Sequence, residues 1–303
     1  LVIRNGFFSF RWSQILEMGA IAESVEVLAA RPESEAVDAA WAPVPVEEVV
    51  ARIEAERPEV VFAPHVETAS GMMLPPDYLR AVAEAVHAGG GLFVLDCIAS
   101  GAEWVDLTES GVDVLISAPQ KGWSGSPCAG FVMLSPAGRA AVEASVSTSF
   151  AADLKKWLGL ADGYREGRAA YHATMPTDAL AVNARVMLEA RERGLGELRT
   201  LQRALGRRVR DLLAERGYPS VAASGFEAPG VVVAHTTDPD LASTAAFARV
   251  GVQAAAGVPL MCGEPEGYRA FRLGLFGLDK LDDIEGTVQR LADALDAVEA
   301  ACG

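Results

Sequence analysis

Short apolar runs alternate with amphipathic stretches over the first part of the chain, up to about Leu134. The runs have the length and residue types of buried β-strands and cover residues 60–63, 92–95, 112–116 and 130–134. Between the first two, Pro75-Pro76-Asp77 opens a helical pattern that Gly89-Gly90-Gly91 ends. This strand, helix and strand form a βαβ pattern, which predicts a largely parallel sheet buried on both faces.

The second part of the chain has a different pattern. Helix-forming residues continue from Asp178 to about Arg216, with one break at Gly194-Leu195-Gly196 that would suit a bend or hinge. Two apolar strands follow, at 230–234 and 270–275, and an amphipathic helix closes the chain. Because 303 residues are too many for one simple core, we expect two domains. The pattern predicts an α/β/α domain over 1–193 and a smaller C-terminal α+β domain over 194–303.

Composition narrows the range of partners. The chain has 26 Lys and Arg against 41 Asp and Glu, and its basic residues form no run, so we expect no nucleic-acid partner. No stretch approaches the roughly 20 apolar residues of a membrane span, which favours a soluble, cytoplasmic protein. The four cysteines lie far apart, which predicts reduced, mostly buried thiols and no metal site: Cys97, Cys128, Cys262 and Cys302.

The strongest chemical signal is a carboxylate and a lysine after neighbouring strands. Asp96 ends one apolar run, and Lys121 follows the next. Since the carboxyl ends of parallel strands form one ligand crevice, the two side chains can converge. A lysine can hold the aldehyde of pyridoxal 5'-phosphate (PLP), and a carboxylate can keep the pyridine nitrogen protonated. Taken alone, the two residues could equally form an ordinary ion pair.

Further motifs occur in a consistent order along the chain. They are Asn5-Gly6-Phe7-Phe8, Pro64-His65-Val66-Glu67-Thr68-Ala69-Ser70-Gly71, Gln120-Lys121, Tyr171-His172-Ala173-Thr174 and Phe271-Arg272-Leu273-Gly274. Together they resemble the class V aminotransferases, which are fold-type I PLP enzymes, and especially the alanine–glyoxylate and serine–glyoxylate branch. The resemblance runs from Asn5 to about Gly277. It implies ping-pong transfer of an amino group between a small amino acid (alanine or serine type) and a 2-oxo acid (glyoxylate or pyruvate type).

The resemblance also implies roles for residues around the PLP ring. Lys121 would hold PLP as a Schiff base, and Asp96 would pair with the ring nitrogen. Phe8 would stack on one ring face and Ile98 would press on the other. Thr68 would bond the phenolic oxygen. A plain core aromatic remains the alternative for Phe8.

Four more residues receive roles at the ends of the cofactor and substrate. Gln120 would reach toward the PLP phosphate. Tyr171 and Thr174 would bond the phosphate of the neighbouring subunit, which implies a homodimer with shared active sites; alternatively, they cap the helix that starts near Pro176. Arg272 would grip the substrate α-carboxylate with its planar guanidinium.

One feature of the family pattern has no counterpart here. The loop that cradles the PLP phosphate lies upstream of the stacking aromatic, and nothing before Asn5 can supply it. We therefore expect that part of the large domain is absent from this chain or not displayed in it.

His65 could be a satisfied, partly buried histidine without a catalytic part.

Two other functions remain open at this level. One is a different PLP reaction on the same fold: a lyase, a cysteine desulfurase or a phosphonate transaminase. Cysteine desulfurases of this fold have a Ser-x-His-Lys pattern at the lysine that holds PLP, whereas here the residue before Lys121 is Gln120. The other is a PLP-free binding subunit. The sequence does not name the amino donor or the keto-acid acceptor.

Overall fold

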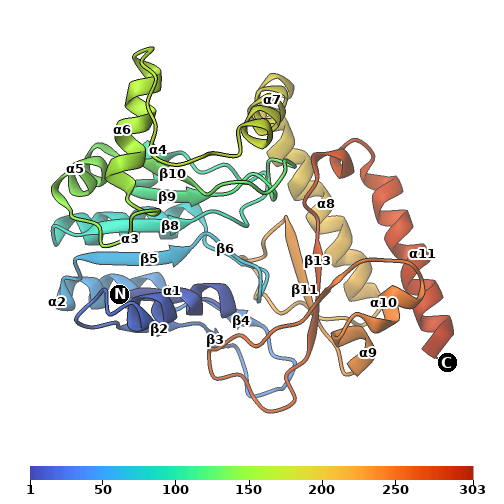
Figure 1. The fold of residues 1–303 in the computed structure, drawn as a ribbon. Coiled ribbons are helices and arrows are strands. Elements are labelled where there is room, and N and C mark those ends of the chain that lie inside the picture. Colours follow the sequence, from blue (N-terminus) through green and yellow to red (C-terminus); the bar gives the residue numbers. More distant parts are fainter. Residues whose placement is uncertain (303) are drawn as a thin grey trace.

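A six-stranded sheet forms the centre of the N-terminal part in the computed structural model, which describes residues 1–302 (Figure 1). Its order is β10-β9-β8-β5-β1-β2, and all neighbours run parallel except β10, which pairs antiparallel with β9 at the edge. The strands are β1 (Val2–Arg4), β2 (Val27–Ala29), β5 (Val60–Pro64), β8 (Leu92–Asp96), β9 (Val114–Ser117) and β10 (Phe131–Leu134). The predicted, largely parallel sheet is confirmed.

Helices cover both faces of this sheet. They are α1 (Phe7–Met18) on one face and α2 (Val46–Glu56) and α3 (Pro76–Ala88) on the other. On the α1 face, the Trp12 ring stacks on Phe62 of β5 with centroids 4.7 Å apart. Leu95 of β8 belongs to the buried core shared with α2 and α3. Because successive strand residues point to opposite faces, β8 directs its last residue, Asp96, toward α1.

The C-terminal part contains a three-stranded antiparallel sheet in the order β11-β13-β12, with α8 and α11 beside it (Figure 1). The elements are β11 (Val231–His235), β12 (Ala255–Ala256), β13 (Ala270–Gly274), α8 (Leu195–Glu215) and α11 (Ile284–Cys302). Leu205, Phe271 and Leu295 share one buried core. The expected smaller α+β part is therefore present.

The predicted break in the long helical stretch is confirmed at Gly194. This glycine separates α7 (Thr177–Arg193) from α8, and its φ of 103° lies in the left-handed region that favours glycine. The domain boundary that we placed between residues 193 and 194 stays a prediction.

The remaining elements are short or project from the sheet edge, as α5 and α6 do beside β10 (Figure 1). They are β3 (Arg31–Pro32), β4 (Trp41–Ala42), β6 (Val66–Glu67), β7 (Met72–Met73), α4 (Leu107–Ser110), α5 (Pro136–Ala144), α6 (Leu154–Arg165), α9 (Pro239–Ala242), α10 (Ala245–Arg249) and a 3-10 helix at Leu278–Leu281. None of the described helices is long and apolar enough to cross a membrane.

The cysteines match their expected state only in part. Cys97, Cys128 and Cys262 are free thiols, but only Cys97 is fully buried, and the other two are half-buried. The side chain of Cys302 lies outside the described residues. Within the described part of the chain, no cluster of three or more His, Cys, Asp or Glu side chains could hold a metal ion.

Candidate active site

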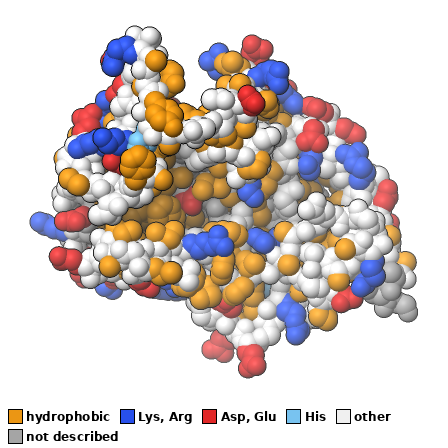
Figure 2. Space-filling view, in the orientation of Figure 1, with side chains coloured by type: hydrophobic (Ala, Val, Ile, Leu, Met, Phe, Trp, Pro, Cys, Tyr) orange, Lys and Arg blue, Asp and Glu red, His pale blue; other side chains and the backbone are white. Residues whose placement is uncertain are grey.

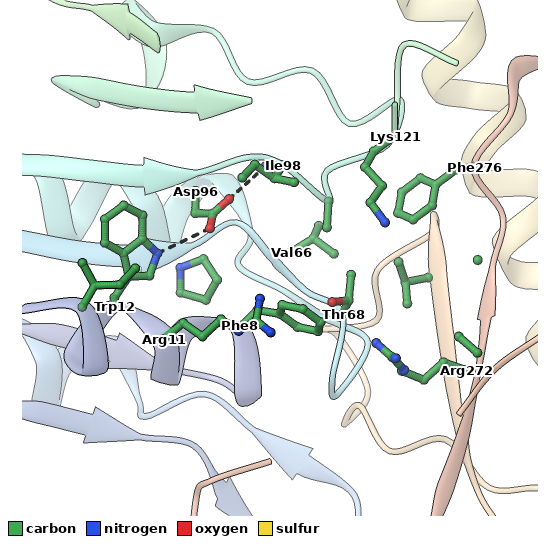
Figure 3. A pocket seen from close by; sticks show the side chains of 16 residues that line it. Phe8, Arg11, Trp12, Val66, Thr68, Asp96, Ile98, Lys121, Arg272 and Phe276 are labelled. Atoms are coloured by element: carbon green, nitrogen blue, oxygen red, sulfur yellow. Dashed lines mark hydrogen bonds between the residues drawn. The ribbon is translucent and has the colours of Figure 1, made fainter. Parts of the chain in front are cut away.

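A cavity of about 490 Å³ lies between the carboxyl ends of the parallel strands and the small sheet (Figure 3). Figure 2 shows this side of the molecule hollowed, with hydrophobic side chains inside the hollow and basic side chains along its lower rim. Most of the predicted site residues line the cavity: Phe8, Thr68, Asp96, Ile98, Lys121 and Arg272. Three do not, namely Gln120, Tyr171 and Thr174.

The parallel topology explains why residues distant in sequence meet here. Phe8 lies in the first turn of α1, directly after β1, and Asp96 ends β8. Thr68 follows the short β6, and Lys121 lies in the loop after β9. Phe8, Asp96 and Lys121 lie at the carboxyl ends of strands of the large sheet, where ligand crevices of such sheets form, and β6 brings Thr68 to the same cavity from the segment that follows β5. Arg272 comes from β13 and faces this edge across the cavity (Figure 3).

Asp96 is a largely buried carboxylate without a cationic partner among residues 1–302. Its oxygens accept hydrogen bonds from the Ile98 backbone N at 3.0 Å and from Trp12 Nε1 at 3.4 Å (Figure 3). Burial raises the pKa of the Asp96 carboxyl above its ordinary value, and the two hydrogen bonds oppose that shift. A buried carboxylate is costly unless a positive group pairs with it. The protonated pyridine nitrogen of PLP is such a group, so this side chain fits the cofactor.

Lys121 points into the same cavity without an ion pair in the described part of the chain. Its Nζ lies 5.2 Å from the centroid of the Phe276 ring, and it forms no salt bridge with Asp96. The ordinary ion pair considered for these residues is therefore not formed. The free amine is suited to attach an aldehyde.

Gly122 holds the lysine loop close to the loop that follows β8. A Cβ atom at this position would lie 2.1 Å from the carbonyl oxygen of Gly101, far closer than two such atoms can approach. Only glycine therefore allows the two backbones to touch. This contact between the two loops helps to bring the side chains of Lys121 and Asp96 to the same cavity.

The cavity has walls suited to a flat ring. Phe8 and Ile98 lie on opposite sides of it in Figure 3, with Thr68 beside Phe8. An aromatic and an aliphatic side chain can enclose the two faces of a heterocycle. The aromatic ring can stack on one face in an offset arrangement, and the aliphatic side chain can pack on the other. Since Phe8 lines the cavity and is only half-buried, it is not simply a core residue.

Arg272 presents a guanidinium to the cavity. Its Nε donates to the Ala256 carbonyl at 2.7 Å, which fixes the plane of the group, and its Cζ lies 5.8 Å from the Phe8 centroid. Burial lowers the pKa of Arg272, while the charges of Glu67 and Tyr268 oppose that change. No carboxylate forms an ion pair with it in the described structure. Its outer N–H groups can therefore bind an anionic ligand.

The remaining predicted residues lie elsewhere. Gln120 is exposed to solvent. Tyr171 is 80% exposed, with its hydroxyl 3.5 Å from Thr174 Oγ1, and Thr174 lines a separate cavity beside β10 and α6. Neither residue caps α7, whose N-terminus at Pro176 has no side-chain hydrogen bond, so that alternative is wrong.

His65 has the environment of a structural histidine. Its Nδ1 lies 2.7 Å from Ser100 Oγ, and the ring is buried. Burial, together with the positive charge of Arg199, lowers the pKa of His65 to about 4. The ring is therefore neutral at ordinary pH and does not line the cavity.

Among the lining residues that sequence reasoning missed, Arg11, Trp12 and Phe276 have the largest functional interest, because they carry a cation or an aromatic ring. Arg11 and Trp12 follow Phe8 on α1 at the three- and four-residue spacing that places side chains on one helix face. That spacing was the available signal, because α1 begins immediately after a strand of the predicted crevice. Phe276 carries no comparable signal in the sequence.

Comparison with known proteins agrees with this geometry. No protein-family model matches the chain. A 2-aminoethylphosphonate–pyruvate transaminase of Burkholderia mallei (strain SAVP1) is 30% identical over 316 residues, which cover 98% of this chain and 76% of that protein. A protein of the same name from Paraburkholderia phymatum is 27% identical over 75% of this chain and 60% of its own length.

Two solved structures with the same fold are aminotransferases. The alanine–glyoxylate aminotransferase of Nostoc sp. has a TM-score of 0.79 at 21% identity and covers 98% of this chain and 74% of its own. An aspartate aminotransferase from Thermus thermophilus has a TM-score of 0.75 at 23% identity, with 98% of this chain and 79% of its own covered. These two likenesses establish the fold.

The sequence relationship establishes more than the fold, because it is 30% identity over nearly the whole chain. It agrees with the unpaired carboxylate, the free lysine amine and the guanidinium that meet at one cavity. The chain belongs to the class V aminotransferase family of fold-type I, PLP-dependent enzymes.

Proposed function

We propose that this aminotransferase moves an amino group between a small amino acid of the alanine or serine type and a 2-oxo acid of the glyoxylate or pyruvate type. The observation that carries the proposal is the convergence of Asp96, Lys121 and Arg272 on one cavity. When bound there, PLP would supply an electron sink for the carbanion formed at the substrate Cα. The protein residues would supply attachment, proton transfer and orientation.

Lys121 and Asp96 divide the work at the two ends of the ring. Lys121 Nζ would be the point of covalent attachment, and its amine, when free, would move a proton at the substrate Cα. Asp96 would keep a proton on the ring nitrogen, because its buried carboxylate has no competing cation within residues 1–302. Trp12 Nε1 and the Ile98 N–H hold that carboxylate in orientation.

Arg272 would orient the substrate by its α-carboxylate. We expect Arg272→Lys to raise KM for alanine and glyoxylate by about 10- to 100-fold, because lysine keeps the charge but cannot make the bidentate contact of guanidinium. Steady-state kinetics with both substrates test this. Arg269→Lys is the matched control, since Arg269 is an exposed residue nearby that does not line the cavity. An unchanged KM in Arg272→Lys would remove Arg272 from substrate binding.

A second candidate donor is an aminophosphonate. It is favoured by the named relatives and by a second guanidinium: Arg11 Cζ lies 5.3 Å from the Phe8 centroid and lines the same cavity as Arg272. The wild-type protein should be loaded with PLP and assayed with alanine and glyoxylate, and with serine and 2-aminoethylphosphonate, each with pyruvate and with glyoxylate. Keto-acid formation from alanine or serine supports the first donor class. Turnover of 2-aminoethylphosphonate alone supports the second, and turnover of none of them contradicts both.

We also propose that the protein is a homodimer in the cytoplasm, with Tyr171 and Thr174 at the partner's active site. Tyr171 and Phe150 are 80% and 76% exposed, and Thr174 lines a second, largely apolar cavity of about 640 Å³. Large exposed aromatic side chains beside an apolar hollow are common at protein interfaces. The absence of a disulfide among Cys97, Cys128 and Cys262 supports the proposed cytoplasmic location.

The dimer has a direct test. Light scattering should give twice the chain mass of 31.9 kDa. In addition, mixing Lys121→Ala chains with chains that carry Tyr171→Phe and Thr174→Ala should restore part of the activity, because a mixed dimer contains one intact shared site. A monomeric mass, or no recovery in refolded mixtures, would contradict the shared site.

A further inference from the structure

Glu67 is a fully buried carboxylate that receives four hydrogen bonds and does not line the cavity. Its Oε1 accepts from the backbone N of Phe8 at 3.3 Å and of Ala69 at 3.0 Å. Its Oε2 accepts from the backbone N and the hydroxyl of Ser9, at 2.9 Å and 2.7 Å. One side chain therefore joins the first turn of α1 to the loop that contains Thr68.

The first turn of α1 lacks other means to satisfy its N–H groups. The helix follows Gly6, which has no side chain to cap it, and its first turn contains no acidic residue. Free N–H groups at a buried helix start require an acceptor, and a carboxylate also interacts favourably with the helix dipole. Glu67 supplies that acceptor from 58 positions away in the sequence. Gly6 makes room for it, since a Cβ there would lie 2.7 Å from Glu67 Cγ.

The helix that Glu67 holds forms one wall of the cavity. Phe8 lies in its first turn, and Trp12, one turn later, donates to Asp96. The charge of Glu67 also acts on Arg272 across the site, where it opposes the effect of burial on the guanidinium pKa. A change at Glu67 would therefore reach the ring-stacking residue, the carboxylate at the ring nitrogen and the substrate-binding arginine.

We propose that Glu67 is a positioning residue of the active site, which holds Phe8 and the Thr68 loop in register for the cofactor ring. The inference rests on the proposed function. If the proposal is correct, replacing Glu67 weakens PLP binding. The loss of any buried helix cap would lower stability, but that loss alone would leave PLP binding unchanged.

Glu67→Gln provides the test because it keeps the size of the side chain. A carboxylate accepts from all four donors, whereas the amide turns an NH2 group toward at least one N–H and leaves that group unsatisfied. We expect the dissociation constant for PLP to rise at least about tenfold. It is measured by titrating the unliganded protein with PLP and following the visible absorbance and the quenching of tryptophan fluorescence.

Asp113→Asn is the matched control. Asp113 is also a buried carboxylate and accepts from the backbone N of Phe93 at 2.9 Å, from Ser135 Oγ at 2.8 Å and from His87 Nε2 at 2.8 Å. It does not line the cavity. Its substitution should lower the melting temperature and leave the dissociation constant for PLP unchanged.

The results expected from these variants separate the possibilities. Weaker PLP binding in Glu67→Gln but not in Asp113→Asn supports the proposal, and equal PLP binding in wild type and Glu67→Gln overturns it. If Glu67→Gln fails to fold, Ser9→Ala, which removes one of the four donors, should show a smaller loss of PLP affinity, and no loss would again overturn the proposal. A wild-type protein that binds no PLP would instead contradict the proposed function.

Discussion

Replacing Lys121 with alanine is expected to abolish aminotransferase activity and the visible absorbance of the lysine-bound cofactor. In the proposed mechanism the side chain would be both the attachment point and the base that moves the proton at Cα, and no other lysine lines the cavity. We expect turnover to fall by at least about 10⁴-fold, the upper range for losing one general base. An absorbance scan with and without added PLP, followed by a keto-acid assay, measures both effects.

Lys156→Ala controls for the removal of a lysine in general. Lys156 is exposed on α6, far from the cavity lining, so this variant should keep the absorbance and the activity of the wild type. A Lys121→Ala protein that retained the yellow colour after dialysis and turned over alanine would show that another group holds the cofactor.

Replacing Asp96 with asparagine is expected to reduce turnover by about 10²- to 10³-fold, as is usual for the loss of one preorganised electrostatic partner. Asparagine cannot keep the ring nitrogen protonated. The unliganded protein should nevertheless change its melting temperature by less than about 4 °C, since the substitution removes a buried charge that has no cation partner among the described residues. Kinetics and thermal unfolding of the same sample give the two results.

The Trp12→Phe variant distinguishes the effect of orienting the Asp96 carboxylate from the effect of its charge. It removes the 3.4 Å hydrogen bond to Asp96 but leaves the carboxylate in place, so its effect on turnover should be much smaller than that of Asp96→Asn. If Asp96→Asn unfolded the protein while leaving the activity of the folded fraction intact, Asp96 would be a structural residue.

Cofactor and substrate residues differ in how far the sequence could predict them. Asp96, Lys121 and Arg272 were predictable, because each follows or lies in a strand and belongs to a motif with a definite chemical purpose. Arg11 and Trp12 shared a helix face with Phe8 but had no motif. Phe276 was not predictable, since its place beside Lys121 depends on how the small sheet packs against the large one.

Contacts between distant loops were invisible in the sequence. Nothing near Glu67 indicates that its carboxylate caps a helix 58 positions earlier, and nothing near Gly122 indicates that its backbone touches Gly101. Such contacts depend on three-dimensional packing and leave no local pattern. Tyr171 and Thr174 are a different case, because their predicted role requires a second chain.

The parallel sheet, the helix break at Gly194 and the chemical types of the side chains at the cavity could be predicted from the amino-acid sequence alone. Local patterns are sufficient for these features because side-chain period and strand ends follow from backbone geometry. Other features became apparent only in the folded chain: Asp96 has no cation partner within residues 1–302, Lys121 forms no ion pair there, and Glu67 supports the wall that carries Phe8. Burial and pairing depend on which segments meet in space, and local sequence patterns do not record which segments those are.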